Sequence, residues 1–135
     1  MPFVPDASIA AAWVLPDEEA EAAESALDRL AAETAIVPAM FWDELRNLLL
    51  SAERRGRIEA GHAESSLARL RRLPIRCPGD AHDHSILELA RRHRLTAYDS
   101  SYLALAVREG CALASLDQRL NEAAAAEGVA LTMHQ

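Results

Sequence analysis

The chain has 135 residues, 50% of them hydrophobic and 26% charged, which fits one globular domain over residues 1–135 and excludes a disordered chain. Its formal net charge is −7, which argues against indiscriminate binding of nucleic acids. No apolar run approaches the roughly 18 residues of a membrane span, so we expect a cytoplasmic protein without a membrane partner.

Alternating strands and helices are expected from the N-terminus onward. A strand at residues 3–4 leads into a first helix that Ser8 is placed to cap. Asp17 is placed to cap a second helix, which runs to about residue 32. Residues 9–15 are apolar but lack a basic leader, so we expect them to pack inward and not to act as a signal peptide.

The remaining chain continues this alternation. Apolar residues recur at helical spacing from Phe41 to near Gly56. Further helices are expected at residues 59–70, 80–94, 98–107 and 117–127. Further strands are expected at residues 35–37, 73–77, 112–116 and 129–133. Short strands separated by helices predict an α/β fold with a parallel sheet covered on both faces.

The arginines are concentrated in the middle of the chain. Residues 46–94 hold eleven of them against six acids, and the sequence has no lysine. Arginine binds phosphate through paired hydrogen bonds, so this stretch could bind along the phosphates of a nucleic-acid backbone. Solvated helix faces would give the same pattern.

Four acidic residues are expected near the edge of the sheet where folds of this topology bind ligands. Asp6 follows the first strand, Asp117 follows the fourth, and Glu44 lies early in the helix after the second strand. Asp99 lies in the first turn of the helix before the fourth strand, so its place depends on how that helix packs. Since ligands bind outside the carboxyl ends of parallel strands, we expect the four carboxylates to converge there.

Converging carboxylates repel one another unless a cation neutralises them. Their oxygens favour Mg²⁺ or Mn²⁺ over zinc, and Mg²⁺ keeps several waters beside a few carboxylates and a substrate phosphate. This combination serves phosphodiester cleavage by a metal-activated water. Each acid also has a structural interpretation, as a helix cap, a turn residue or a surface acid.

Four segments resemble the PIN-domain family, in particular the VapC-like toxins of bacterial toxin–antitoxin pairs. They are VPDAS at residues 4–8, PAMFWDELRNLL at 38–49, LTAYDSSYLALA at 95–106 and ASLDQRL at 114–120. Their order and spacing match the family over essentially the whole chain. The resemblance implies a three-layer α/β/α fold with a central parallel sheet of four to five short strands.

The same resemblance implies a metal-dependent ribonuclease that forms a homodimer. It assigns catalytic and metal-binding roles to Asp6, Glu44, Asp99 and Asp117, with Mg²⁺ or Mn²⁺ as the cofactor. Ser8, Asn47 and Ser115 match positions that support the site, and Ser115 stands where threonine is common in the family.

The resemblance also predicts control by a small antitoxin protein. That partner would cover the acidic cleft and present an Arg or Lys to the carboxylates. Trp13 and Trp42 are candidate apolar anchors for it, because aromatic side chains carry much of the energy at interfaces. Burial of both rings in the core is the competing interpretation.

Two other functions remain open at this stage. A phosphatase-like α/β domain would use Asp6 as a covalent nucleophile, but that chemistry usually has a second carboxylate two residues on, where this chain has Ser8. A non-catalytic PIN-like protein would only bind partners, and the presence of all four acids argues against it.

Overall fold

A small parallel sheet forms the centre of the protein. The computed structural model describes residues 1–131. Its strands are β1 (Phe3–Pro5), β2 (Ala35–Ile36), β3 (Ile75–Arg76) and β4 (Ala112–Ala114). They lie in the order β3-β2-β1-β4 with parallel pairing throughout. The predicted parallel sheet is therefore confirmed.

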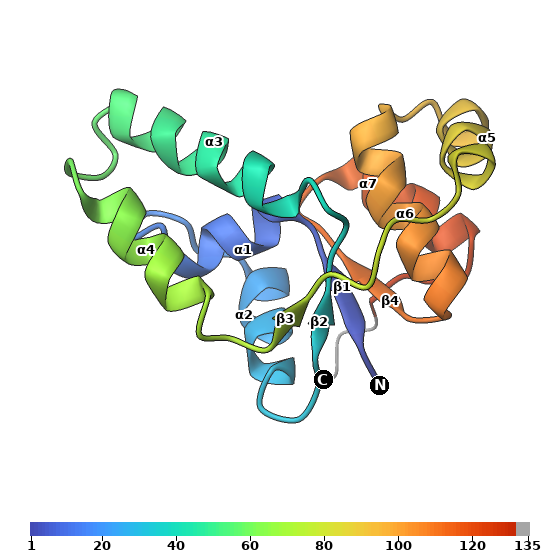
Figure 1. The fold of residues 1–135 in the computed structure, drawn as a ribbon, viewed down its shortest axis with the longest axis horizontal. Helices are drawn as coiled ribbons and strands as arrows, with labels where there is room; N and C mark the ends of the chain where they lie inside the picture. Colours follow the sequence, from blue (N-terminus) through green and yellow to red (C-terminus); the bar gives the residue numbers. More distant parts are fainter. Residues whose placement is uncertain (132–135) are drawn as a thin grey trace.

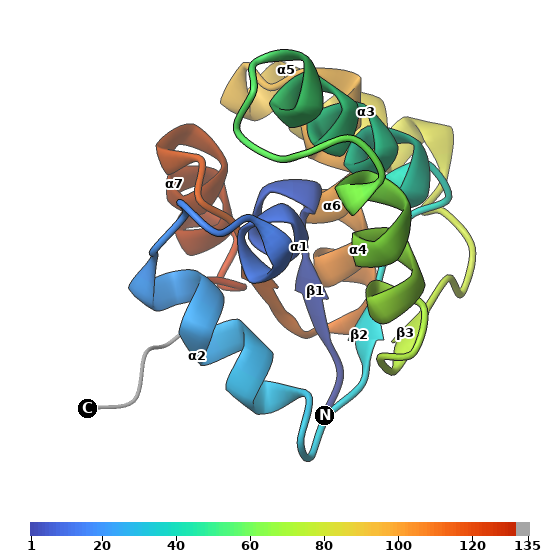
Figure 2. The ribbon, with the colours of Figure 1, turned by 90° about the vertical axis from the view of Figure 1, so that its left-hand side faces the viewer.

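Helices cover both faces of this sheet. They are α1 (Ala7–Val14), α2 (Glu21–Arg29), α3 (Phe41–Arg54), α4 (His62–Leu70), α5 (Asp83–His93), α6 (Ala97–Glu109) and α7 (Gln118–Ala126). Figure 1 shows α1 to α4 on one side of the strands and α5 to α7 on the other. Figure 2, turned by 90°, has α1 and α4 in front of the strands and α6 behind them. The three layers are those expected from the sequence.

The alternation of side chains along β1 builds a core on each face of the sheet. Phe3 is fully buried in a cluster that includes Ile9 of α1 and Ala26 of α2. The next residue, Val4, is fully buried in a second cluster that includes Leu103 of α6. Successive strand residues point to opposite faces, so this strand must be apolar on both sides, as its sequence is.

Two predicted helix caps are wrong. The first helix is capped by Asp6, whose carboxylate accepts the backbone N–H of Ile9, and not by Ser8. The cap lies closer to the strand because β1 passes into α1 with a single residue between them. The second helix begins only at Glu21, and Asp17 instead pairs with the guanidinium of Arg57. A bidentate partner 40 residues away competes with capping for that carboxylate.

The last predicted strand, at residues 129–133, is reduced in the described part of the chain to one parallel bridge between Ala130 and Leu113. Residues 132 and 133 lie outside the described residues. The third predicted strand is also shorter than expected, since only Ile75 and Arg76 pair with β2. Across the described residues, no helix is both long and apolar enough to cross a membrane.

Candidate active site

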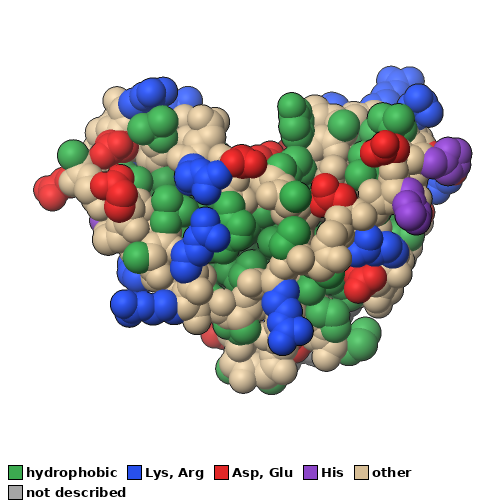
Figure 3. All heavy atoms as spheres, in the orientation of Figure 1, with side chains coloured by type: hydrophobic (Ala, Val, Ile, Leu, Met, Phe, Trp, Pro, Cys, Tyr) green, Lys and Arg blue, Asp and Glu red, His purple; other side chains and the backbone are tan. Residues whose placement is uncertain are grey.

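A cleft opens at the carboxyl ends of the strands. Figure 1 shows α3 and α6 beginning on opposite sides of this edge, and Figure 3 shows the surface hollowed between them, with acidic side chains at the bottom of the notch. The cleft has a volume of about 230 Å³. Its lining residues are Asp6, Ala7, Ser8, Glu44, Asn47, Leu48, Asp99, Tyr102 and Asp117. All four predicted acids therefore reach one cavity.

Asp6 is the most deeply buried of these acids, with 6% of its surface exposed. One oxygen, Oδ1, accepts the hydroxyl of Ser8 at 2.6 Å and the backbone N–H of Ile9 at 3.1 Å. The other oxygen, Oδ2, accepts the hydroxyl of Ser115. A carboxylate has roughly four lone-pair sites, so these contacts fix its orientation and leave one site on Oδ2 for a ligand in the cleft.

The same two hydroxyls tie Asp6 to the loop that carries Asp117. The Ser8 hydroxyl accepts the backbone N–H of Leu116 at 3.1 Å, and the Ser115 hydroxyl accepts that of Asp117 at 2.9 Å. Asp117 itself caps α7 by accepting the N–H of Leu120 at 2.9 Å. The hydroxyls of Ser8 and Ser115 thus form two bridges across the ends of the adjacent strands β1 and β4.

Glu44 is held from the opposite wall of the cleft. The buried phenol of Tyr102 on α6 donates to Oε1 of Glu44 on α3 at 2.6 Å. This hydrogen bond joins the two helices that begin on either side of the cleft. Sequence reasoning assigned no role to Tyr102, although it lies one helical turn after Asp99 and therefore on the same face of α6.

Asp99 lies in the first turn of α6, where the Thr96 hydroxyl accepts its backbone N–H at 3.1 Å. The topology explains why this end of α6 is at the cleft. The helix leads into β4, so it runs antiparallel to the strands, and its N-terminus falls at their carboxyl edge. The sequence left this placement open, and the packing settles it.

Burial and mutual repulsion raise the pKa values of three of these acids. Desolvation is the largest cause for Asp6, Glu44 and Asp99 alike. Repulsion from Asp99 adds to the rise in the pKa of Asp6 and of Glu44, and repulsion from Asp117 adds to that of Asp99. Hydrogen bonds from Ser115, Ser8 and Ile9 partly offset the rise for Asp6. The four carboxylates therefore share one electrostatic environment.

No cationic side chain neutralises this environment within residues 1–131. None of the four carboxylates takes part in an ion pair there, and the cleft lining holds no Arg, Lys or His. Over the same residues, no group of three or more His, Cys, Asp or Glu side chains forms a ready-made metal cage. An open set of carboxylates suits Mg²⁺, which keeps most of its waters, better than an ion that needs a full protein cage.

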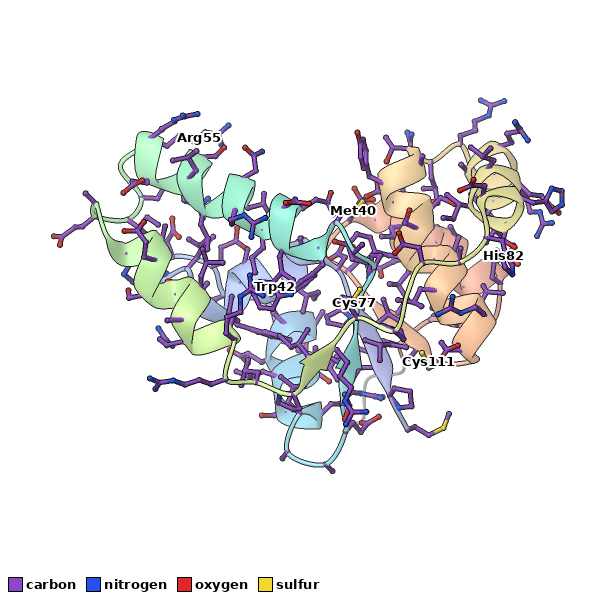
Figure 4. All side chains as sticks on the ribbon, in the orientation of Figure 1. Met40, Trp42, Arg55, Cys77, His82 and Cys111 are labelled. Carbon is purple, nitrogen blue, oxygen red and sulfur yellow. The ribbon has the colours of Figure 1, made fainter. Side chains whose placement is uncertain are left out.

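The two tryptophans proposed as partner anchors are both half-buried. Trp13 donates its indole N–H to the carbonyl of Ala23 at 2.8 Å, which fastens α1 to α2. Trp42 packs edge-on against Phe41, and the guanidinium of Arg71 lies 3.7 Å over its ring. In Figure 4, Trp42 lies between α3 and α4, away from the acidic cleft. Both rings have a structural role in the chain, whatever else they contact.

Comparisons with known proteins address the family and the fold. Residues 3–126 match the family model described as the PIN domain. The "VapC ribonuclease Mb0985" of Mycobacterium bovis is 35% identical over 126 residues, which cover 93% of each chain. Among solved structures, PAE2754 from Pyrobaculum aerophilum superposes with a TM-score of 0.66 at 20% identity, covering 91% of this chain and 84% of that one. VapC20 of Mycobacterium tuberculosis, described as a sarcin–ricin loop cleaving toxin, superposes with a TM-score of 0.58 at 16% identity, covering 91% and 95%.

Proposed function

Because this chain belongs to the PIN-domain family, we propose that it is a metal-dependent endoribonuclease, the toxin of a type II toxin–antitoxin pair. One observation carries the proposal: four carboxylates from distant parts of the chain line a single cleft whose described lining includes no cation. The names of its relatives, which include ribonucleases of the VapC type, support RNA as the substrate.

The residues that would hold the metal are Asp6, Glu44, Asp99 and Asp117. The hydrogen bonds of three of them leave room for a ligand: Asp6 retains a lone-pair site on Oδ2, Glu44 is engaged at Oε1 alone, and Asp117 caps its helix through Oδ1 alone. When bound, Mg²⁺ or Mn²⁺ would activate a water and offset charge on the scissile phosphate. The carboxylates would orient the ion, and Asn47, also in the cleft lining, could donate to a phosphate oxygen.

We also propose a small antitoxin as the controlling partner and a homodimer as the active form, acting on RNA in the cytoplasm. The antitoxin would place an Arg or Lys in the cleft, because a guanidinium or ammonium can neutralise the carboxylates in place of the metal. The pKa values of Asp6, Glu44 and Asp99 are raised, because burial and repulsion make their ionised forms costly. A cation in the cleft would stabilise these ionised forms and so offset that cost.

The surroundings of Asp6 disfavour the phosphatase alternative. A covalent aspartyl nucleophile is usually accompanied by a second carboxylate two residues on. That position is Ser8 here, and its hydroxyl donates to Oδ1 of Asp6 at 2.6 Å. A trapped aspartyl-phosphate on Asp6 would restore that alternative, and a folded chain that cleaves no RNA would support the purely partner-binding one.

The test is cleavage of RNA by the purified chain, with analysis of the ends of the products. Attack by a metal-activated water leaves a 5′-phosphate and a 3′-hydroxyl, whereas attack by the ribose 2′-hydroxyl leaves a cyclic phosphate. We expect the first pair of ends, and we expect no cleavage by the Asp6→Asn variant. Cyclic phosphate products, or cleavage by that variant at the wild-type rate, would contradict the proposal.

A further inference from the structure

Two exposed apolar side chains lie on the helices that form the walls of the acidic cleft. Leu48 on α3 lines the cleft and is 39% exposed. Tyr98 on α6 is 65% exposed, the largest exposed fraction for an aromatic residue in the described chain. It precedes Asp99 directly and lies one helical turn before Tyr102, which lines the cleft. Residues four apart share a helix face, so Tyr98 extends the cleft wall outward past Tyr102.

The cleft floor alone offers little affinity for a polyanion. Its described lining holds four carboxylates and no basic side chain, so a bound metal ion would be the one positive charge that phosphate meets there. RNA also carries bases, whose flat faces are uncharged and stack on aromatic rings. An exposed tyrosine ring beside a metal-dependent phosphodiesterase site is suited to that contact.

We propose that the Tyr98 ring is a stacking subsite for an unpaired nucleobase next to the scissile phosphate, with Leu48 as the apolar contact on the opposite wall. This inference rests on the proposed function and adds a specificity element to it. A base in a duplex is already stacked on both faces, so the subsite selects RNA that is single-stranded at the cleavage point. Since every base has a π-face, the subsite favours single-stranded RNA with little preference for its sequence.

Cleavage kinetics provide the first test. Tyr98→Ala removes the ring on which the base would stack, so its kcat/KM should fall roughly 5- to 100-fold. Tyr98→Phe keeps the ring, so its kcat/KM should stay within about twofold of the wild type. Val107→Ala is the matched control, because Val107 is an exposed apolar residue near the other end of the same helix. Equal rates for Tyr98→Ala and the control would overturn the proposal.

Abasic substrates identify the contact. Removing the base on one side of the scissile bond should slow the wild type and leave Tyr98→Ala unaffected, because the stacking partner is already missing. An abasic penalty of the same size in both proteins would show that Tyr98 acts in another way. A change of oligomeric state in Tyr98→Ala, measured by light scattering, would also overturn the proposal, since Tyr98 would then be a contact between copies.

A binding measurement separates this inference from the nuclease proposal. Single-stranded RNA containing 2-aminopurine is titrated with protein in Ca²⁺, which takes oxygen ligands as Mg²⁺ does. Stacking quenches the fluorescence, so the wild type and Tyr98→Phe should quench it and Tyr98→Ala should not. This result would support the subsite even if no RNA were cleaved. Quenching by all three proteins, or by none, would refute it.

Discussion

Asp6 serves the fold and the site with the same carboxylate. It caps α1 through Ile9 and receives the hydroxyls of Ser8 and Ser115, and it also lines the cleft. From the sequence, a helix cap and a catalytic acid were competing interpretations of this position. The helix cap and the cleft-lining acid are one residue here, because a strand that passes directly into a helix places its capping residue at the carboxyl edge of the sheet, where ligands bind.

Replacing Asp99 by Asn should abolish cleavage and leave the protein folded. A missing metal ligand removes several kcal/mol of transition-state stabilisation, so the loss in kcat should exceed about a hundredfold. The measurement is the single-turnover rate of the purified variant on an RNA that the wild type cleaves. A folded Asp99→Asn protein that cleaves at the wild-type rate would show that the site is misassigned.

The same variant should be more stable than the wild type at neutral pH. The pKa of Asp99 is raised in the folded state by burial and by Asp117, so ionisation of Asp99 opposes folding. That cost is absent below the unfolded pKa of about 4 and grows as pH rises through the folded pKa. Urea denaturation should show a gain of about 1 kcal/mol or less at pH 7, because Asp99 is partly solvated, and no gain at low pH.

Replacing Tyr102 by Phe should weaken catalysis without disrupting α6. The phenol donates to Glu44, and its loss removes a hydrogen bond that lowers the pKa of that carboxyl. The acidic limb of the pH–rate profile should therefore move to higher pH, and half-saturation should need more Mg²⁺. A structural role for Tyr102 would move neither quantity. Tyr98→Phe, the same exchange on the same helix, is the control that should move neither.

At the scale of whole elements, periodicity predicted the helices better than capping did. The apolar spacing from Phe41 onward correctly gave α3, and the helix expected at residues 98–107 lies within α6. The caps assigned to Ser8 and Asp17 were wrong. The residue that caps α1 is Asp6, two residues before Ser8, and Asp17 pairs instead with Arg57, 40 residues away. A long-range partner such as Arg57 cannot be inferred from the local sequence.

The four acids were predicted to converge from their positions at the ends of strands and in the first turns of helices, whereas the contacts that orient them were not predicted. Tyr102 reaches Glu44 from 58 residues away, and the Ser115 hydroxyl reaches Asp6 from 109 residues away. These contacts between residues far apart in the sequence depend on how α6 and β4 pack on β1. Residue type and order therefore identified the carboxylates, and the fold was needed to show what holds them.

The N-terminal turn of α6 offers a prediction for this element. Thr96 caps the helix by accepting the N–H of Asp99, so Thr96→Ala should cost about 1 kcal/mol of stability. It should also loosen the turn that carries Asp99 and lower kcat. Thr96→Ser keeps the hydroxyl and should restore both stability and kcat. Loss of stability in Thr96→Ala without any change in kcat would show that the cap does not position Asp99.

For the whole molecule, the proposed control by an antitoxin can be tested in cells. Expression of the wild-type chain alone should arrest growth, and co-expression with a small protein from the adjacent gene should relieve the arrest and yield a complex. Asp99→Asn should be harmless in either case and should still bind the partner if Trp42 or other apolar contacts provide the anchor. Harmless expression of the active chain, with no partner captured, would contradict the toxin assignment and leave the nuclease assignment intact.

Charge is distributed over the molecule in a way that fits a metal-dependent site. The formal net charge is −7, and the cleft lining concentrates four carboxylates without a described cation. A polyanionic substrate would be repelled from such a cleft in the absence of a counterion. Divalent metal should therefore be required for cleavage and not merely accelerate it.

Metal dependence is tested most directly by the initial rate of RNA cleavage as a function of divalent metal after exhaustive chelation. We expect no cleavage by the chelated protein and a saturable return of activity with Mg²⁺ or Mn²⁺, the oxygen-preferring ions that suit carboxylates. Full activity in the chelated protein, with no response to added metal, would rule out a metal-dependent site.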